Sequence, residues 1–351
     1  DNPEMEILYR ILDWAEKNDV DVFLQQMWAN VEWNAYPELR KDAVGIATSA
    51  PWSLDEFAAG LAELTHHLLR VKGYRSIRWL SISNEPGHDW SWWQGPDGKP
   101  LPITPGLAAV RRALDHRGID LPLSAPDWTD LPDLDPAQID FDALTGAYDL
   151  HSYNAVFDNM KGGYSLSVAE ERLARWARWA HARNKPLFLS ELGTMAYGWG
   201  GSEAAPGGYE SGLKNASLLV RGLAAGVDAF NRWSFTNRGD LDGQWQLVDT
   251  WDVAGGRLQS EFTPHPNAYY QYGLLTRFTA KYSAVLKTEI EGEFPAAGRK
   301  LVAAALRSPG GNLTLLVVNE TPSDVDATMS LRGLTDNINL YRYSVTRAER
   351  D

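Results

Sequence analysis

Two glutamates, Glu85 and Glu191, each end a short apolar stretch of the sequence. Glu85 closes the run IRWLSISNE at residues 77–85, and Glu191 closes the run PLFLSE at residues 186–191. Short apolar runs of this kind predict buried strands. In a parallel α/β barrel the carboxyl ends of the strands form the active-site face, so both side chains would point into one pocket. Two carboxylates that face each other across a pocket are what hydrolysis of a glycosidic bond requires.

The bulk composition narrows the class of protein. The chain has 351 residues, of which 44% are hydrophobic and 23% charged, as in an ordinary globular protein. Its net charge of −13 argues against nucleic acids and anionic membranes as partners. The absence of cysteine excludes disulfides, thiol nucleophiles and thiolate metal sites. No signal-peptide pattern opens the chain, so either none exists or it has been removed. We expect a secreted or periplasmic protein rather than a cytoplasmic one.

Strand-like and helical segments alternate along residues 1–280. Strands are expected at residues 20–28, 77–85, 121–125, 147–153, 186–191 and 227–235. Helices are expected near residues 3–18, 53–73, 104–118, 138–144, 167–180, 210–225 and 266–279, with a long loop at residues 29–51. This alternation predicts a parallel sheet with helices outside it, which is the α/β class.

Three helix starts carry recognisable capping residues. Ser53 and Ser167 are each followed by a glutamate three residues later, the pattern of a capping box. Thr104 with Pro105 matches an N-cap residue followed by a proline at the first helical position. Each pattern predicts where a helix begins.

The pattern changes from about residue 281. Short strands separated by turn signals are expected at residues 301–306, 313–318, 327–331 and 339–345, with no helical period. We therefore predict a small antiparallel β-sandwich domain at residues 281–351, following a barrel domain at residues 1–280. We expect this small domain to pack against the side of the barrel rather than to bind sugar.

Aromatic residues are abundant, with 15 tryptophans and 14 tyrosines. Trp90, Trp92 and Trp93 cluster beside glycine and proline, which predicts a loop, and binding residues concentrate on loops. Flat aromatic faces pair with the C–H faces of pyranose rings, so we expect this cluster to stack on sugars. The alternative is that the cluster belongs to a large aromatic core.

The Asn84-Glu85-Pro86 triplet at a predicted strand end resembles the acid/base motif of clan A glycoside hydrolases, the retaining (β/α)8 enzymes. In that clan the Asn-Glu pair ends barrel strand four, and the nucleophile glutamate ends strand seven. Glu191 ends the third predicted strand after that of Glu85, which matches this spacing. The layout is most similar to families 30 and 39, and family 5 is close in its motifs. The resemblance implies a TIM-type (β/α)8 barrel.

The resemblance also implies roles for single residues. Glu191 corresponds to the nucleophile and Glu85 to the acid/base, with Asn84 hydrogen-bonded to the sugar 2-hydroxyl. His151 and Tyr153, separated by one residue, look like the clan's His-x-Tyr, whose members contact the sugar or the nucleophile. The alternative for His151 is a hydrogen-bonded structural histidine.

Three tryptophans are candidates for lining a sugar site. Trp233 falls at the presumed eighth strand, where the clan often carries a tryptophan floor. Trp28 and Trp128 fall at or just after predicted strand ends, and Asn30 and Asn154 are further candidates of the same kind. Any of the tryptophans could instead belong to the core.

The chain departs from the clan in one respect. Counted back from Glu85, the strand predicted at residues 20–28 is the third barrel strand, so strands one and two have no counterpart in this chain. The clan's arginine near the end of strand two, which helps to hold the nucleophile ionised, has no counterpart either. An incomplete barrel exposes two strand edges. We therefore expect the gap to be closed by self-association into a homo-oligomer or by rearranged packing.

These observations together predict a retaining β-glycosidase that acts on a polysaccharide or oligosaccharide. No cofactor or metal is expected, because two carboxylates suffice for the reaction. The sugar, the linkage and endo or exo action are open, with glucan, xylan and galactan all considered. The alternative is a non-catalytic carbohydrate-binding protein on an incomplete barrel, which would bind sugar without turnover.

Overall fold

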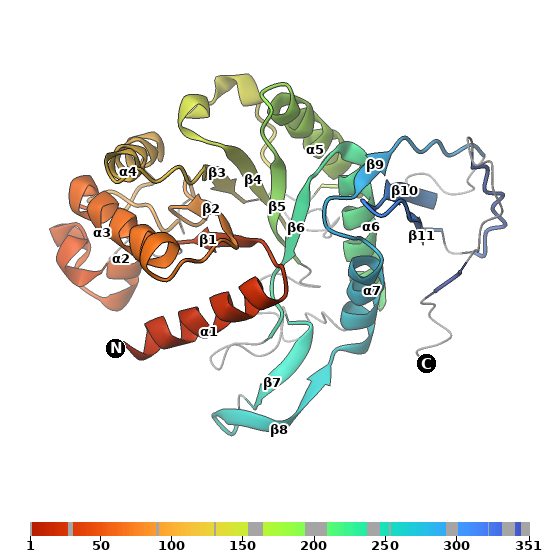
Figure 1. Cartoon of the computed structure of the whole chain (residues 1–351), viewed down its shortest axis with the longest axis horizontal. Helices are drawn as coiled ribbons and strands as arrows, with labels where there is room; N and C mark the ends of the chain where they lie inside the picture. Colours follow the sequence, from red (N-terminus) through yellow and green to blue (C-terminus); the bar gives the residue numbers. More distant parts are fainter. Residues whose placement is uncertain are drawn as a thin grey trace. The chain divides into compact units, whose positions relative to one another are not determined.

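The structure of the chain is a computed structural model (Figure 1). It describes residues 2–26, 31–88, 91–129, 131–153, 164–193, 209–236, 246–252, 254–292, 301–321, 323–331 and 341–344. The chain divides into two compact units, Asp1–His151 with Arg178–Ser190 and Ser152–Ala177 with Glu191–Asp351. The division passes through two strands near their carboxyl ends, β4 (Ala147–Ser152) and β5 (Leu187–Leu192).

Six strands form one sheet in the order of the chain. They are β1 (Val22–Gln25), β2 (Ile77–Ser81), β3 (Leu123–Trp128), β4, β5 and β6 (Ala229–Arg232). The pairings β1–β2, β2–β3 and β3–β4 are parallel. Every residue of β4 and β5 is buried, as expected of parallel strands covered on both faces. The predicted number and order of strands are confirmed, although β1 and β6 are shorter than predicted.

Two strand ends differ from the prediction where they affect the candidate site. β2 ends at Ser81, so Glu85 lies in a turn beyond the strand, with a φ angle of 45°. β3 continues past Ala125 to Trp128. Its register with β4 is irregular between Pro126 and Trp128. Proline cannot donate to a strand ladder, and the irregular register accommodates it.

Helices connect the strands. They are α1 (Pro3–Lys17), α2 (Ala43–Thr48), α3 (Leu54–His66), α4 (Thr104–His116), α5 (Leu166–His181) and α6 (Tyr209–Ala225). α3 continues into a π-helical turn, His67–Val71, and packs against α4 within the first unit (Figure 1). Residues 29–51, predicted as loop, contain α2 and the 3₁₀ turns Glu32–Asn34 and Pro37–Leu39. The weak helix predicted at residues 138–144 is replaced by two 3₁₀ turns, Pro136–Gln138 and Asp142–Leu144.

One of the three predicted helix caps is confirmed and two are wrong. The Ser53 hydroxyl accepts a hydrogen bond from the first turn of α3 at 3.3 Å, as predicted. Thr104 is itself the first residue of α4, and Ile103 holds the cap position without a side-chain hydrogen bond. Ser167 lies inside the first turn of α5, where Ser165 accepts the capping bond instead. Each wrong assignment is displaced by one or two residues, the usual uncertainty at helix ends.

The second unit contains two strands that match those expected at residues 301–306 and 313–318, and three that were not expected, at residues 248–252, 257–264 and 284–286. β7 (Val248–Asp252) and β8 (Arg257–Pro264) form an antiparallel pair, followed by α7 (Pro266–Arg277). β9 (Ala284–Leu286), β10 (Leu301–Arg307) and β11 (Leu313–Asn319) form a three-stranded antiparallel sheet in the order β11-β10-β9. The strand predicted at residues 327–331 is wrong, because these exposed residues have no ladder partner. Residues 341–344 of the other predicted strand are not a strand either, and its remaining residues lie outside the described part of the chain.

A buried ionic group holds α6 to the end of this small sheet. Arg221 of α6 donates to both carboxylate oxygens of Glu320, the residue after β11, at 2.9 and 2.7 Å. Arg221 also pairs with Glu170 of α5, and Ser217 donates to Glu320. Two-pronged arginine–carboxylate pairs combine charge with fixed geometry. The C-terminal sheet therefore packs on α6 through a specific contact.

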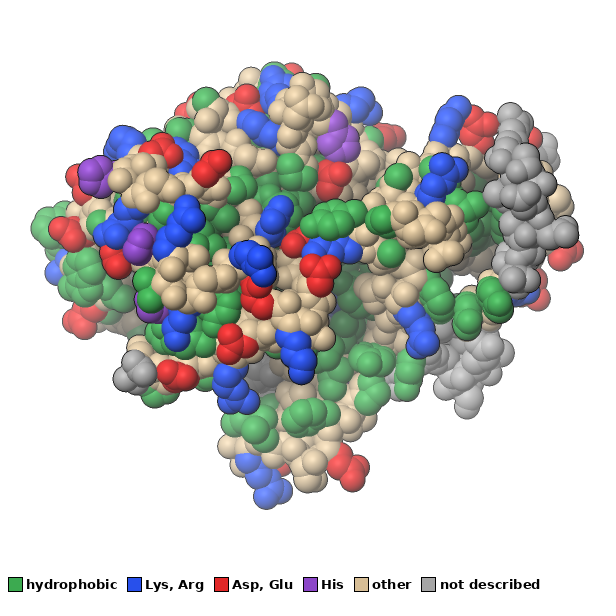
Figure 2. Space-filling model, viewed as in Figure 1, with side chains coloured by type: hydrophobic (Ala, Val, Ile, Leu, Met, Phe, Trp, Pro, Cys, Tyr) green, Lys and Arg blue, Asp and Glu red, His purple; other side chains and the backbone are tan. Residues whose placement is uncertain are grey.

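Charge is mixed on the surface. Figure 2 shows acidic and basic side chains interspersed over the face that it draws. Among the helices that the structure describes, none has both the length and the apolar character needed to cross a bilayer.

Candidate active site

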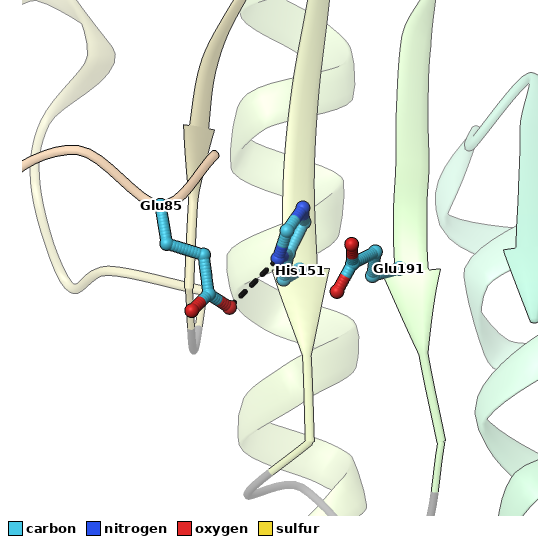
Figure 3. A group of neighbouring side chains, drawn as sticks. All are labelled: Glu85, His151 and Glu191. Atoms are coloured by element: carbon cyan, nitrogen blue, oxygen red, sulfur yellow. Dashed lines mark hydrogen bonds and ion pairs between the residues drawn. The ribbon is translucent and has the colours of Figure 1, made fainter. Parts of the chain in front are cut away.

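Glu85 and His151, two of the predicted site residues, are in contact. Glu85 lies in the turn after β2, and His151 lies near the carboxyl end of β4 (Figure 3). Glu85 Oε1 lies 2.9 Å from His151 Nδ1. The glutamate side chain is 14% exposed, whereas the imidazole is fully buried. The carboxylate is therefore held on one side and still reachable from solvent.

The second imidazole nitrogen also faces a carboxylate. His151 Nε2 lies 2.8 Å from Oδ1 of the buried Asp127. A neutral imidazole has one donor and one acceptor, and an ionised carboxylate only accepts. Two such contacts require either an imidazolium or a proton on one carboxylate. The group Glu85–His151–Asp127 therefore holds one proton more than a neutral histidine beside two carboxylates would. A cation bound by His151 would have to displace one of these hydrogen bonds.

Asp149 extends this buried group. It is fully buried in β4, and its Oδ1 accepts a hydrogen bond from the Asp127 backbone N–H at 2.8 Å. Burial, and then the negative charge of Asp127, raise the pKa of Asp149 well above its usual value. Neither aspartate was predicted as a site residue. The signal that could have indicated Asp149 is an acidic residue inside an otherwise apolar strand, because such burial is costly without partners.

Gln25 joins the ends of three neighbouring strands. From the end of β1, its Nε2 lies 2.6 Å from Asp127 Oδ2, 3.2 Å from Asn84 Oδ1 and 3.3 Å from the Ser83 carbonyl oxygen. These contacts orient the amide of Asn84, which is only 5% exposed. Gln25 was not predicted, because the strand was expected to run to residue 28 and only the structure ends it at Gln25.

Glu191 and Tyr153 are in contact within the second unit. The Tyr153 hydroxyl, directly after β4, donates to Glu191 Oε2 at 2.7 Å, and Glu191 is buried. A Cβ atom at Gly193 would lie 3.0 Å from Tyr153 Cε1 and 2.6 Å from Arg232 Nη1. The backbone that follows Glu191 therefore passes closely against both side chains, and glycine makes this approach possible.

Arg232, the last residue of β6, brings a positive charge to this group. Its Nη1 donates to the Leu192 carbonyl oxygen at 3.2 Å and to the Trp233 carbonyl oxygen. Burial lowers the pKa of Arg232 to about 10, opposed by the nearby hydroxyls of Tyr153 and Tyr272. The guanidinium therefore stays charged at neutral pH. Arg232 was not predicted, because nothing in the sequence relates it to Tyr153.

Trp128 lies beside the turn that carries Glu85. A Cβ atom at Gly87 would lie 3.7 Å from Trp128 Nε1, and the Trp128 ring packs edge-on against Phe141 with centroids 6.0 Å apart. Trp128 is only partly buried. Its predicted contact with sugar stays a prediction.

Trp233 directly follows β6 and is also partly buried. Its backbone N–H donates to the Leu192 carbonyl oxygen at 2.9 Å, which places it next to the end of β5. Its role as a sugar floor stays a prediction. Trp28, Asn30 and Asn154 lie outside the described residues.

The predicted sugar-stacking role of Trp93 is wrong. Trp93 is 2% exposed, packs edge-on against Phe57 with centroids 5.8 Å apart, and donates to the Pro102 carbonyl oxygen. It is a core residue. Trp92 is partly buried, and Trp90 lies outside the part of the chain that the structure describes.

Comparison with known proteins gives matches among solved structures, whereas no family model and no curated protein matches the chain. A conserved exported protein from Bacteroides fragilis matches with a TM-score of 0.56 and 14% identity, over 77% of this chain and 60% of its own. A monomeric beta-xylosidase from Caulobacter crescentus CB15 matches with a TM-score of 0.53 and 16% identity, over 81% and 58%. A GH39 beta-xylosidase from Caulobacter crescentus matches with a TM-score of 0.51 and 13% identity, over 82% and 59%.

The chain shares the fold of these structures. It spans less than two thirds of the length of each of them, with coverages of 60%, 58% and 59%. Two of the three are beta-xylosidases, so the resemblance predicted from Asn84-Glu85-Pro86 is supported at the level of the fold. Identities of 13–16% carry no information on the reaction.

Proposed function

We propose that the chain carries the active site of a retaining β-glycosidase, with Glu191 as the nucleophile and Glu85 as the general acid and base. One observation carries the proposal: His151 contacts Glu85, and Tyr153, two residues further along, contacts Glu191. Side chains two residues apart along a strand point to the same face of a sheet. We therefore expect the two glutamates to face each other.

Chain connectivity supports the same arrangement. The hydroxyl of Ser190, the residue before Glu191, lies 3.3 Å from the Leu150 carbonyl oxygen and 3.5 Å from Asp127 Oδ1. Ser190 therefore contacts both Asp127 and the strand that carries His151. Because consecutive Cα atoms lie about 3.8 Å apart, the Glu191 backbone lies next to these contacts. Retaining hydrolysis needs the two carboxyl groups about 5–5.5 Å apart, and the proposal requires this separation.

The proposed reaction has two steps. In the first, a Glu191 oxygen attacks the anomeric carbon while Glu85 gives its proton to the glycosidic oxygen, so that the bond to the leaving group breaks and a glycosyl–Glu191 ester forms. In the second, Glu85 takes a proton from water, the hydroxide oxygen bonds to the anomeric carbon, and the ester bond breaks. Both carboxyl groups return to their starting protonation states.

The neighbouring residues fit these two roles. In the proposal, the extra proton of the Glu85–His151–Asp127 group resides on Glu85, as a general acid requires. Tyr153 donates to Glu191, and Arg232 adds a positive charge beside Tyr153, both of which favour an ionised nucleophile. In the proposal, Asn84 binds the sugar hydroxyl next to the reacting carbon. Trp128 and Trp233 line the sugar, and no cofactor is needed.

In the proposal, the substrate is a neutral β-linked glycan. The proposal also includes secretion or export of the protein. Two matched structures are xylosidases by title, so aryl β-xylosides are tested first, followed by aryl β-glucosides and β-galactosides.

The experiment compares the wild-type chain with Glu85→Gln and Glu191→Gln. We expect Glu191→Gln to lose turnover on every substrate. Loss of a general acid costs about 10²–10⁴-fold, and we expect this loss for Glu85→Gln on nitrophenyl glycosides. The loss of kcat/KM should be much smaller on dinitrophenyl glycosides, because that leaving group departs without a proton. The value of kcat should stay low, because the second step still lacks its base.

A fluorosugar inactivator gives a second, independent readout. We expect mass spectrometry to find the inactivator bonded to Glu191 in the wild type and in Glu85→Gln. Full activity in either variant would show that the affected carboxylate is assigned wrongly. Sugar binding with no turnover on any substrate would favour a non-catalytic carbohydrate-binding protein.

A further inference from the structure

The connection between β1 and α3 contains a hollow that the proposed reaction does not use. Its volume is about 640 Å³, within the range of about 300–1,000 Å³ that ligand pockets occupy. Seven residues of the first unit line it: Trp33, Asn34, Trp52, Ser53, Leu54, Asp55 and Glu56.

Two of the lining residues are tryptophans that the fold leaves exposed. Trp33 and Trp52 are each 60% exposed. Scattered apolar residues on a surface need no explanation, but apolar side chains gathered in one hollow mark a binding site. Both indoles therefore offer aromatic surface in the hollow to a ligand.

The backbone holds both tryptophans in place. The buried Asn34 side chain accepts from the Ser53 N–H at 2.8 Å and donates to the Ser53 carbonyl oxygen at 3.1 Å, and the Trp52 N–H donates to the Asn34 carbonyl oxygen at 2.7 Å. Arg40 Nη2 donates to the Trp33 carbonyl oxygen at 2.8 Å, and its guanidinium lies 5.8 Å from the Trp52 ring centroid. The backbone that carries both tryptophans is therefore fixed before a ligand binds, which lowers the entropy cost of binding.

The polar groups of the hollow select the kind of ligand. Asp55 and Glu56 are exposed carboxylates in the first turn of α3, and they accept hydrogen bonds from hydroxyl groups and repel anions. The Arg40 guanidinium already lies over Trp52 and disfavours a cation there. A neutral ligand with an apolar face and a rim of hydroxyl groups fits both conditions, and a pyranose ring is such a ligand.

The hollow is connected to the loop that follows Glu85. The Ala50 N–H donates to the Gln94 carbonyl oxygen at 2.8 Å, and the Gln94 N–H donates to the Thr48 carbonyl oxygen at 2.9 Å. Both segments are connections that follow the carboxyl ends of parallel strands, the side on which barrel active sites lie. A glycan chain bound in the hollow would therefore lie on the same face as Glu85.

We propose that this hollow is a second sugar-binding site, which holds one part of a neutral polysaccharide while another part is cleaved. The link to cleavage rests on the proposed function, whereas the binding of sugar does not. The site would make the protein act better on a polymer than on a short glycoside.

The test uses the full chain with the double variant Trp33→Ala/Trp52→Ala. Phe262→Ala is the matched control, because Phe262 is an aromatic residue that is 62% exposed but belongs to β8 and does not line the hollow. Binding is measured by electrophoresis in gels that contain soluble xylan, β-glucan or β-galactan, with Glu191→Gln in every protein to prevent cleavage. We expect the double variant to bind the preferred polysaccharide at least about tenfold more weakly, and Phe262→Ala to bind as strongly as the parent.

A second measurement uses proteins with Glu191 intact. We expect the double variant to lose more kcat/KM on the polysaccharide than on an aryl glycoside of the same sugar. A Trp33→Tyr/Trp52→Tyr variant keeps two aromatic faces, should retain most of the binding, and replaces the alanine variant if that fails to fold.

The possible outcomes separate the two proposals. Undiminished polysaccharide binding by the folded double variant would overturn the second site and leave the proposed function standing. Tryptophan-dependent binding in a chain that hydrolyses nothing would support the second site and overturn the proposed function. Equal losses on polymer and aryl glycoside would also count against a separate site.

Discussion

At the scale of single residues, the two glutamates are held by different partners, an imidazole for Glu85 and a phenol for Glu191. Tyr153→Phe removes the hydroxyl that donates to Glu191. A buried acceptor left without its donor costs about 1–3 kcal/mol, so we expect kcat/KM on an aryl glycoside to fall by roughly 5- to 150-fold. Tyr341→Phe, at a 73% exposed residue, should change nothing. Unchanged kinetics in Tyr153→Phe would contradict a role for this hydrogen bond.

Asp149 predicts a pH dependence of stability. Its folded-state pKa is raised above the unfolded value, so between the two values the folded chain binds more protons than the unfolded chain. The stability that this group contributes is complete below the unfolded pKa of about 3.9 and is lost as the pH rises through the folded pKa. Asp149→Asn cannot ionise and keeps an acceptor for the Asp127 N–H.

The measurement is the free energy of unfolding in urea, from about pH 4 upward, for the wild type and Asp149→Asn. The other titrating groups are common to both proteins, so the difference reports Asp149 together with its interaction with Asp127. We expect the wild type to lose more stability than the variant with rising pH. Parallel profiles would show that Asp149 does not retain its proton in the folded chain.

At the scale of elements, a buried ion pair between Arg221 and Glu320 joins α6 to the end of β11. Arg221→Met leaves Glu320 without its two-pronged partner, and breaking a buried pair costs about 3–5 kcal/mol. Lys99→Ala breaks a pair with Asp97 that is exposed to solvent and therefore contributes little to stability. Urea unfolding should therefore show a large loss for the first variant and almost none for the second. Equal effects would mean that the buried pair does not hold the two elements together.

At the scale of the whole molecule, the chain has an unpaired apolar surface next to a sheet end. β1 is terminal in the strand order, and α1 before it exposes Ile7, Ile11 and Trp14 by 58%, 57% and 60%. These residues follow the helical spacing of an apolar stripe. We expect this surface to be covered by self-association, so that light scattering gives a mass that rises with concentration. Ile7→Glu/Ile11→Glu should shift the particle toward one chain, and a wild type that is monomeric at all concentrations would contradict the prediction.

The sequence by itself determined the features that depend on local pattern. Short apolar runs alternating with helical periods predicted six strands in the observed order. Carboxylates at the ends of two of these runs made Glu85 and Glu191 the candidate catalytic residues. Periodicity reports which residues are buried along one element, because side chains repeat every 2 residues in strands and every 3.6 in helices. Strand ends and helix caps were predicted less well, as the positions of Ser81 and Ser165 show.

Only the tertiary structure decided which residues surround the two glutamates. Gln25 and Asp127 are 102 positions apart in the chain and yet 2.6 Å apart in space, and no local period relates them. Burial separated Trp93, a core residue, from Trp33 and Trp52, although all three lie in connections between a strand and a helix. The physical reason is that a side chain's hydrogen-bond partners and exposure depend on segments brought together by folding, which the residues on either side of it do not specify.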